Sequence, residues 1–383
     1  MQGFTFQSTK SLLMEPGASA RIGELVKTLG CGSVLLVTDP GVMGAGLLQA
    51  GLKGLSQAGV AVTVFSEVEA DPPVHVIERA VAMARAAKVN GIVAIGGGSS
   101  MDVAKLVALL ALSDETLAEI YGVGLVKGRR LPLVLAPTTA GTGSEVTPIS
   151  IVTTGENEKK GVVSPVLLPD WAVLDAELTL GLPAHVTAAT GIDAMVHAIE
   201  AYTSKRLKNP MSDALAREAL RLLGGNIHAV CRNGANIEAR HNMLFGSMLA
   251  GMAFANAPVA AVHALAYPVG ARFQVAHGLS NSLVLPQVLQ FNALAAEAHY
   301  AEIADILVPG KGQDAASRVA ELVKWLSALP VDLGLPTRLR EVGIAESDIA
   351  ALAEDAMKQT RLLVNNPREM TQADALGIYR AAL

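Results

Sequence analysis

The stretch GIVAIGGGSS, residues 91–100, decides the fold, because an apolar strand runs without a break into a glycine-rich turn. A helix is expected to begin in that turn, which makes a strand–turn–helix unit of the kind that builds parallel sheets. The residues around it repeat the same alternation. Strands are expected at 33–38, 61–65 and 133–136, and helices at 41–58, 74–88 and 99–113. Apolar strands that alternate with helices are typical of a parallel sheet covered on both faces.

Residues 1–182 are therefore predicted to form a doubly wound α/β domain with a Rossmann-like parallel sheet. The strand-like runs 149–153 and 172–174 are interpreted as a hairpin-rich extension of that domain. Beyond residue 182 the chain is rich in Ala, Leu and Met at helical spacing and has few β-branched runs. An all-helical second domain, residues 183–383, is the prediction. Its expected helices include 187–203, 212–231, 237–255 and 313–327.

The composition excludes several classes of protein. Hydrophobic residues make up 51% of the 383 residues and charged residues 17%, which describes a large buried interior and not a disordered chain. A net charge of -5 argues against nucleic acid as a main partner, because phosphate binding needs a basic surface. The two cysteines, Cys31 and Cys231, are too few for a disulfide framework and lack metal-ligand spacing, so a cytoplasmic protein is expected.

A membrane is not an expected partner either. The first residues, MQGFTF, lack the basic region and apolar core of a signal peptide. The uncharged stretch 243–262 is long enough to span a bilayer, but it lacks Lys, Arg or aromatic anchors on both flanks. We interpret it as a helix buried inside a bundle.

The glycine-rich turn at 96–100 suits a diphosphate, because glycines allow close backbone approach and a helix N-terminus offers unpaired N–H groups. Ser99 could equally be a plain N-cap. Asp39 ends the first expected strand, where its carboxylate could hold ribose hydroxyls and reject a 2′-phosphate, which favours NAD over NADP. An Asp-Pro-Gly turn is the equal alternative there. The stretch PTTAGTGSE, residues 137–145, has more hydroxyls than a structural turn needs, which favours contact with a ligand.

Four residues in the second half have the chemistry of metal ligands. Asp193 and His197 are spaced i, i+4, so on a helix they project from one face. His263 and His277 follow, separated by an apolar turn region. One carboxylate and three imidazoles would satisfy Fe²⁺ or Zn²⁺, whereas Ca²⁺ or Mg²⁺ would need more oxygens. Each histidine alone could be a satisfied core residue, but four such groups in apolar surroundings would be costly to bury unpaired.

Together these stretches resemble one family, the iron-containing (group III) alcohol dehydrogenases, along essentially the whole chain. Residues 96–105, GGGSSMDVAK, resemble the pyrophosphate segment of that family, and residues 137–145 resemble its threonine-rich cofactor loop. Residues 191–202, GIDAMVHAIEAY, resemble its first metal motif. The segment from His263 to His277-Gly278 resembles the second. The resemblance implies a dinucleotide-binding α/β domain followed by a helical metal-binding domain, the architecture also found in dehydroquinate synthase.

By position in these motifs, the resemblance implies roles for individual residues. The implied metal ligands are Asp193, His197, His263 and His277. The implied cofactor contacts are Gly97, Gly98, Ser99, Thr138, Thr139 and Thr142, with Asp39 at the position associated with NAD preference, Asp102 beside the nicotinamide, Lys159 at the ribose, and Thr179 and Leu182 at the adenine. Lys160 leaves a one-residue ambiguity for Lys159. Phe254 is implied to lie on the substrate side.

Tyr267 departs from the family pattern, which often has a histidine four residues after the third metal ligand. A tyrosine hydroxyl can relay a hydrogen bond, but its pKa near 10 makes it a poorer proton shuttle at neutral pH. The expected function is reversible hydride transfer between a primary alcohol and NAD, with Fe²⁺, or Zn²⁺ instead, as the metal. The alternatives are a metal- and NAD-dependent lyase of the dehydroquinate-synthase type and a catalytically silent metal- or nucleotide-binding protein. A homodimer or higher homo-oligomer is expected on symmetry grounds.

Overall fold

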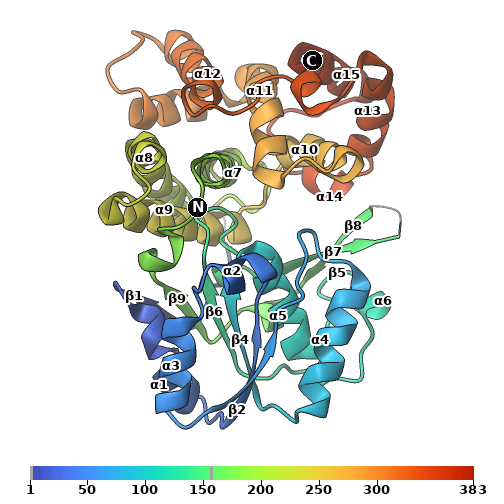
Figure 1. Ribbon diagram of the computed structural model, residues 1–383. Coiled ribbons are helices and arrows are strands. Elements are labelled where there is room, and N and C mark those ends of the chain that lie inside the picture. Colours follow the sequence, from blue (N-terminus) through green and yellow to red (C-terminus); the bar gives the residue numbers. More distant parts are fainter. Residues whose placement is uncertain (1–2, 156–157) are drawn as a thin grey trace. The chain divides into compact units, whose positions relative to one another are not determined.

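Six parallel strands form the sheet that the sequence predicts, in a computed structural model that describes residues 3–155 and 158–383 (Figure 1). The chain divides into two compact units, one of residues 7–181 and one of residues 182–383 together with the described residues before Gln7. The sheet lies in the first unit, in the order β1-β9-β6-β4-β2-β3. Its strands are β1 (Ser11–Met14), β2 (Ser33–Val37), β3 (Ala61–Phe65), β4 (Gly91–Gly96), β6 (Leu133–Pro137) and β9 (Trp171–Leu174).

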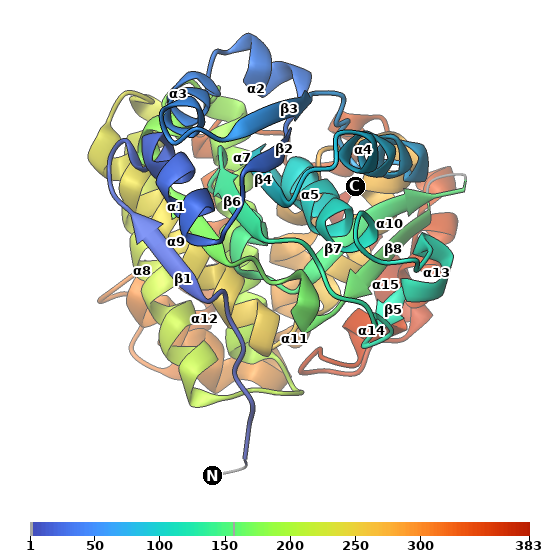
Figure 2. The same ribbon diagram turned by 90° about the horizontal axis from the view of Figure 1, so that it is seen from below.

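Alternate residues of the central strands supply two separate cores, which is why helices cover both faces of the sheet. On β4, Ile92 and Ala94 join the core under α4 and α5, whereas Val93 and Ile95 join the core under α1 and α3. Figure 2 shows α4 and α5 on one side of the strands and α1 and α3 on the other. The helices of this unit are α1 (Ile22–Thr28), α2 (Pro40–Gly44), α3 (Gln49–Gln57), α4 (Val74–Ala86), α5 (Gly98–Leu110) and α6 (Leu117–Ile120).

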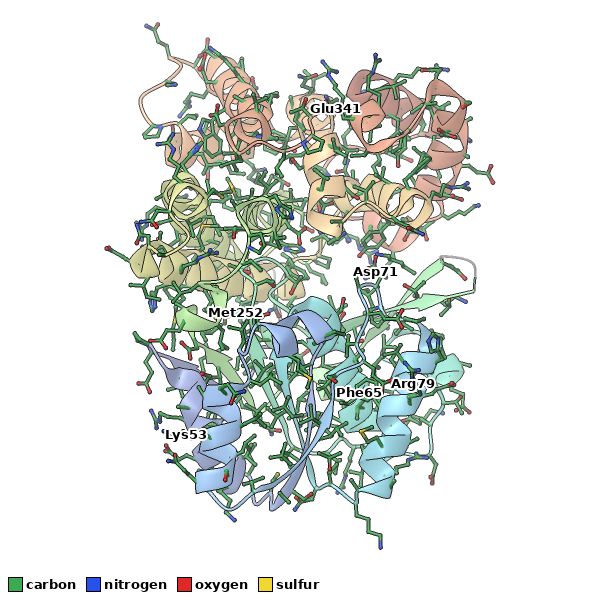
Figure 3. All side chains as sticks on the ribbon, in the orientation of Figure 1. Lys53, Phe65, Asp71, Arg79, Met252 and Glu341 are labelled. Carbon is green, nitrogen blue, oxygen red and sulfur yellow. The ribbon has the colours of Figure 1, made fainter. Side chains whose placement is uncertain are left out.

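Side chains follow the same division between core and surface. Phe65, at the end of β3, is 1% exposed and lies inside the unit, whereas Lys53 points outward from α3 (Figure 3). Apolar cores therefore cover both faces of the sheet, and polar groups that could bind a ligand are expected at the carboxyl ends of its strands. The direction in which successive strands are added to the sheet reverses at β2, because β3 pairs with one side of β2 and β4 with the other. The ends of β2 and β4 thus flank the switch point at which ligands bind in open parallel sheets.

Two expectations about this unit are wrong in detail. The helix expected at 41–58 is broken into α2 and α3, and Gly46 between them has a φ of 73°, which a continuous helix does not allow. The run 172–174 belongs to β9 of the main sheet and not to a hairpin extension, because it pairs with β1 and β6. The run 149–153 does form a hairpin. It lies in a second sheet made of β7 (Ile149–Thr154), β8 (Glu158–Val163) and β5 (Gly122–Val123).

The second unit is helical, as predicted, so the expected succession of an α/β unit and an all-helical unit is confirmed. Residues 191–203 of α7 are buried on every side, because α8, α9 and α11 pack around this helix. The helices are α7 (Ala184–Thr203), α8 (Pro210–Arg232), α9 (Ile237–Asn256), α10 (Ala261–Phe273), α11 (His277–Leu307), α12 (Ala315–Asp332), α13 (Ile349–Met357), α14 (Thr360–Leu363) and α15 (Gln372–Ala382). Short 3-10 helices are η1 (Ala18–Arg21), η2 (Ser144–Val146), η3 (Pro165–Leu167), η4 (Ala176–Thr179), η5 (Leu339–Val342) and η6 (Glu346–Asp348).

The apolar stretch 243–262 is not one helix, since α9 ends at Asn256 and α10 begins at Ala261. Within the part of the chain that the structure describes, no single helix has both the length and the hydropathy of a membrane span. The helices α9 and α10 meet those criteria when taken together, and they are bent by 107° relative to each other.

Candidate functional site

Three helices of the second unit bring together the four residues with metal-ligand chemistry. Asp193 and His197 lie one turn apart on α7, His263 lies in the first turn of α10, and His277 begins α11. One ligand atom from each residue lies within 4.8 Å of those of the other three. Asp193 Oδ1 is 3.9 Å from His263 Nε2 and 3.6 Å from His277 Nε2. Ligand atoms of one tetrahedral ion lie roughly 3.3–3.6 Å apart, so the cluster has the size that a transition-metal ion needs.

Three of the four residues are buried, whereas the side chain of His277 is 31% exposed, and the electrostatics of the cluster favour an ionised carboxylate. Asp193 and His263 are each 2% exposed. Burial by itself would raise the pKa of Asp193, because the carboxylate loses its water. The imidazoles of His197, His277 and His263, with a hydrogen bond from Asn281, outweigh burial and hold the pKa of Asp193 below its ordinary value. One carboxylate and three imidazoles are a ligand set for Fe²⁺ or Zn²⁺.

Asn281 is a functional candidate that the motifs alone do not reveal. Its Nδ2 donates to Asp193 Oδ1 over 2.6 Å and lies 3.4 Å from Nε2 of both His263 and His277. Its Oδ1 is buried and, among the described residues, has no hydrogen-bond partner. An oxygen left without a partner beside four ligand atoms fits a site that is completed by a cation. The signal in the sequence was spacing, because Asn281 follows His277 by one helical turn.

Glu200 is a second functional candidate that the motifs alone do not reveal, although it lies within the first metal motif. It is one turn beyond His197 on α7, and its carboxylate lies 2.6 Å from Nδ1 of His263. It accepts hydrogen bonds from the backbone N–H groups of Ala260 and Val262. A carboxylate on the far nitrogen of a metal-binding histidine is a common feature of metal sites.

Aromatic rings flank the histidines. Phe254, from α9, stacks on His197 with ring centroids 4.3 Å apart, and His197 stacks on His263 at 4.7 Å. Tyr267, one turn beyond His263 on α10, lies 5.7 Å from the ring of His277 and edge-on to His263 at 6.3 Å. The structure therefore places both of these predicted residues in contact with the ligand cluster.

The glycine-rich turn of the first unit joins β4 to α5, and Gly97 is the N-cap of that helix. Gly97 has a φ of -75°, which any residue adopts, and a Cβ atom there would meet nothing closer than Thr139 at 3.8 Å. The fold therefore does not require a glycine at 97, which fits a cradle that leaves room for a phosphate. Gly98 differs, because its Cβ would lie 2.8 Å from Cγ2 of Thr142. Ser99 is not the N-cap; it lies in the first turn and accepts a hydrogen bond from the N–H of Asp71.

Asp39 lies between β2 and α2, at the switch point of the sheet. Its Oδ1 caps α2 by accepting from the N–H of Val42 over 2.9 Å, so the structural turn is present. Its Oδ2 accepts from Ser100 Oγ over 3.3 Å, at the edge of the glycine-rich turn. The carboxylate thus stands beside the cradle while also capping a helix. Thr138, which follows β6, is buried and donates its N–H to Gly96.

A buried ionic network links α5 to the threonine-rich loop. Ser144 Oγ donates to Asp102 Oδ1 over 2.6 Å and accepts from Lys105 Nζ over 2.7 Å. Asp102 Oδ2 accepts from the N–H of Ile151. Burial lowers the pKa of Lys105 to about 8 and raises the pKa of Asp102 and, to about 7, that of Glu145. This network holds the segment that bears Thr138, Thr139 and Thr142 against the cradle helix.

Lys159 and its neighbour Lys160 have different surroundings. Lys159 is the buried one of the pair, with 9% of its side chain exposed, and it pairs with Asp71 Oδ1 at 2.5 Å. Lys160 is 41% exposed and pairs with Glu158. Asp71 (Figure 3) lies just before α4, has a φ of 52°, and accepts a hydrogen bond from Thr153 through its carbonyl. Lys159 is therefore the lysine tied to the segment that touches Ser99.

The two residues predicted to contact adenine lie in different units. Thr179 ends η4, is 1% exposed, and donates its hydroxyl to the carbonyl of Ala176. Leu182 begins the second unit, where its carbonyl accepts from Thr187 and Arg240. These contacts do not test a role at the adenine, so both cofactor contacts stay predictions.

A doubly wound sheet with a glycine-rich turn between β4 and α5, followed by a helical unit with a three-histidine, one-carboxylate cluster, is typical of metal- and nucleotide-dependent enzymes. The sequence profile of the iron-containing alcohol dehydrogenases matches residues 9–176, and the profile of the C-terminal part of the same family matches residues 187–383. The chain belongs to the iron-containing alcohol dehydrogenase family and is an oxidoreductase.

Relatives agree over nearly the whole length. Long-chain-alcohol dehydrogenase 1 of Geobacillus thermodenitrificans is 41% identical over 372 residues, which cover 96% of this chain and 93% of the relative. The crystal structure of 1,3-propanediol oxidoreductase superposes with a TM-score of 0.96 at 34% identity, covering 100% of both chains. Sulfoacetaldehyde reductase from Bifidobacterium kashiwanohense, solved in complex with NAD⁺, has a TM-score of 0.89 at 28% identity and covers 100% of this chain and 99% of that one.

Proposed function

We propose that this enzyme transfers hydride reversibly between a primary alcohol and NAD⁺, and that a divalent ion held by Asp193, His197, His263 and His277 is required. The observation that carries the proposal is the cluster of one carboxylate and three imidazoles, in a chain that also has a glycine-rich cradle. The three relatives described above are named for long-chain alcohols, 1,3-propanediol and sulfoacetaldehyde. These compounds share an oxygen on a terminal carbon, which favours a primary alcohol or its aldehyde as the substrate class.

The ion that we propose is Fe²⁺, with Zn²⁺ as the alternative. Both ions accept imidazole and carboxylate ligands, and the four donors supply three nitrogens and one oxygen. Ca²⁺ and Mg²⁺ prefer six or more oxygens and fit this set poorly. Asp193 contributes the negative charge that a divalent ion needs, and its Oδ1 lies 3.9 Å from Nε2 of His263 and 3.6 Å from Nε2 of His277.

When bound, the ion supplies Lewis acidity at the substrate oxygen and the nicotinamide supplies the hydride acceptor. The chain's own residues position the reactants and move the proton. Phe254 holds the ring of His197 by stacking and presents an apolar face on the substrate side. The ring of Tyr267 lies edge-on to His263 and tilted beside His277. We propose that its hydroxyl passes the alcohol proton toward solvent.

We propose that the first unit binds NAD through the turn at Gly97, Gly98 and Ser99 and through the loop at Thr138, Thr139 and Thr142. The room for a Cβ at Gly97 supports this role, since the fold itself leaves that space free. The carboxylate of Asp39 supports a preference for NAD, because its charge would repel the 2′-phosphate of NADP. The remaining proposed contacts are Asp102 at the nicotinamide, Lys159 at the ribose, and Thr179 and Leu182 at the adenine.

The test is NADH formation by metal-stripped protein that has been reconstituted separately with Fe²⁺ and with Zn²⁺. A panel of short and long primary alcohols and diols supplies the substrates, and NADP⁺ serves as a parallel cofactor. Metal-dependent reduction of NAD⁺ supports the proposal, and Asp193→Ala should abolish both metal retention and turnover. No turnover with metal and NAD⁺ demonstrably bound would favour the lyase or the catalytically silent protein. We also propose a homodimer or higher homo-oligomer, which light scattering would test.

A further inference from the structure

Three nitrogen atoms converge on the carboxylate of Glu200, which is 4% exposed and lies on the central helix α7. Its Oε1 accepts from the N–H of Val262 over 2.7 Å. Its Oε2 accepts from the N–H of Ala260 over 3.0 Å and lies 2.6 Å from Nδ1 of His263. These three nitrogens belong to Ala260, Val262 and His263 at the start of α10, so one side chain contacts both the beginning of that helix and the ring of a metal ligand.

The chemistry of these contacts determines which nitrogen of His263 carries a proton. Backbone N–H groups can only donate, so Glu200 acts as an acceptor toward Ala260 and Val262. A carboxylate that is accepting from two amides accepts from the imidazole as well, which puts a hydrogen on Nδ1. The neutral ring then has its lone pair on Nε2. That nitrogen faces the cluster, 3.9 Å from Asp193 Oδ1.

We propose that Glu200 is a positioning residue that selects the Nδ1–H tautomer of His263, and thereby keeps Nε2 available to the divalent ion. This inference rests on the proposed metal site. Glu200 touches neither substrate nor cofactor; it acts through His263. The carboxylate also makes the imidazole more electron-rich, which strengthens a bond from Nε2 to the ion.

Glu200→Gln separates this role from a general contribution to folding, because glutamine has the same size but only one acceptor oxygen. If the amide oxygen replaces Oε1 and accepts from Val262, the NH₂ group takes the place of Oε2. There it meets the N–H of Ala260 and donates to Nδ1 of His263, which forces the proton onto Nε2. If the oxygen faces His263, the NH₂ group meets a backbone N–H of α10. Glu200→Asp keeps the charge and both acceptor oxygens and shortens the side chain by one methylene, so it should preserve the tautomer at longer distance.

A matched control exists in the other unit. Asp175 is 0% exposed, and its carboxylate accepts from the backbone N–H groups of Gly17, Ser19 and Glu177. Asp175→Asn thus makes the same exchange, a carboxylate for an amide under three donors, where no histidine is involved. It should cost stability in the same way and leave the metal site alone.

The experiment titrates Co²⁺ into metal-stripped wild type, Glu200→Gln, Glu200→Asp and Asp175→Asn, and follows the visible absorption of the bound ion. We expect Glu200→Gln to weaken Co²⁺ binding roughly 10- to 100-fold and to change the absorption spectrum. Glu200→Asp should recover most of the affinity, and Asp175→Asn should bind Co²⁺ like the wild type. Nitrogen chemical shifts of ¹⁵N-histidine protein, loaded with Zn²⁺, should show His263 protonated at Nδ1 in the wild type.

Wild-type Co²⁺ affinity and spectrum in a folded Glu200→Gln protein would overturn the inference, and so would a wild-type His263 that is protonated at Nε2. The second measurement decides the matter even if Glu200→Gln does not fold. Failure of the wild type itself to bind Co²⁺ or Zn²⁺ would instead overturn the proposed metal site. The two failures are therefore distinguishable.

Discussion

Gly278→Ala should damage the metal site through packing alone, without touching a ligand. Gly278 is the second residue of α11, where that helix crosses α7. A Cβ atom at this position would lie 2.3 Å from the carbonyl oxygen of Ala189 and 3.3 Å from Cβ of Asp193. Both neighbours belong to α7, and the closer one is backbone that cannot rotate away. The start of α11 must therefore recede by about 1 Å to reach an ordinary contact of 3.4 Å.

His277 begins α11 and would move with it, whereas Asp193 and His197 would stay on α7. Metal–ligand distances tolerate about 0.2 Å, so a displacement of about 1 Å should weaken binding of Fe²⁺ or Zn²⁺ by at least tenfold. The strain should also lower the free energy of unfolding of the metal-free protein by roughly 1–3 kcal/mol.

The assay is competition for Zn²⁺ with a chromophoric chelator, together with thermal unfolding of the metal-free and metal-loaded protein. The matched control is Gly225→Ala, in the interior of α8, where a Cβ would meet nothing within 4 Å. That substitution should stabilise the helix by about 0.5–1 kcal/mol and leave Zn²⁺ affinity unchanged. A Gly278→Ala protein that binds Zn²⁺ as tightly as the wild type would refute the reasoning, because the close approach of α7 and α11 would then not control the position of His277.

Three further perturbations test other parts of the chain. Gly97→Ala should leave the free energy of unfolding within about 1 kcal/mol of wild type and weaken NADH binding, measured by NADH fluorescence, because the added Cβ fills space that only a ligand needs; equal NADH affinity would contradict the cradle. Burial raises the pKa of Glu145 from its ordinary 4.5 to about 7, so its contribution to stability is full below pH 4.5 and is lost as the pH rises through 7. The free energy of unfolding of Glu145→Gln, relative to that of the wild type, should therefore rise by about 3 kcal/mol between acidic and alkaline pH. The same dependence of unfolding free energy on pH in both proteins would contradict this expectation. Tyr267→Phe should lower kcat roughly 10- to 100-fold with little change in alcohol KM, and Tyr267→His should restore kcat with a pH profile shifted to lower pH; an unchanged kcat in the phenylalanine variant would remove the hydroxyl from the proton path.

Local pattern was enough to predict most of the first unit and, in the second unit, the helices α7, α8, α9 and α12. The apolar runs at 33–38, 61–65 and 133–136 overlap β2, β3 and β6, because a strand buried on both faces needs apolar residues at every position. Local pattern does not predict which strands pair with one another in the sheet. Nothing in the run 172–174 indicates that it inserts between β6 and β1, since that pairing joins segments far apart in the chain.

The metal cluster was predictable for a different reason, namely that ligand chemistry is rare in apolar helices. Asp193 and His197 stand out by their spacing, and His263 and His277 stand out because histidine has little reason to be buried without a partner. Their supporting residues did not stand out. Glu200 is one acidic residue among many until α10 folds back and presents His263 Nδ1 to it. Such a residue is defined by tertiary contact and not by sequence spacing.

Two glycines show that a sequence motif can locate a site without revealing why a glycine is needed there. Gly97 and Gly278 both lie in motifs and both lie near the start of a helix, Gly97 as the N-cap of α5 and Gly278 as the second residue of α11. At Gly278 the protein itself fills the space, since Ala189 on α7 occupies the position that a Cβ would take. At Gly97 nothing in the protein fills it, since the nearest atom would be 3.8 Å away. The same residue type therefore serves helix packing at a metal ligand in one unit and access for a ligand in the other, and only the surroundings of the missing Cβ distinguish the two.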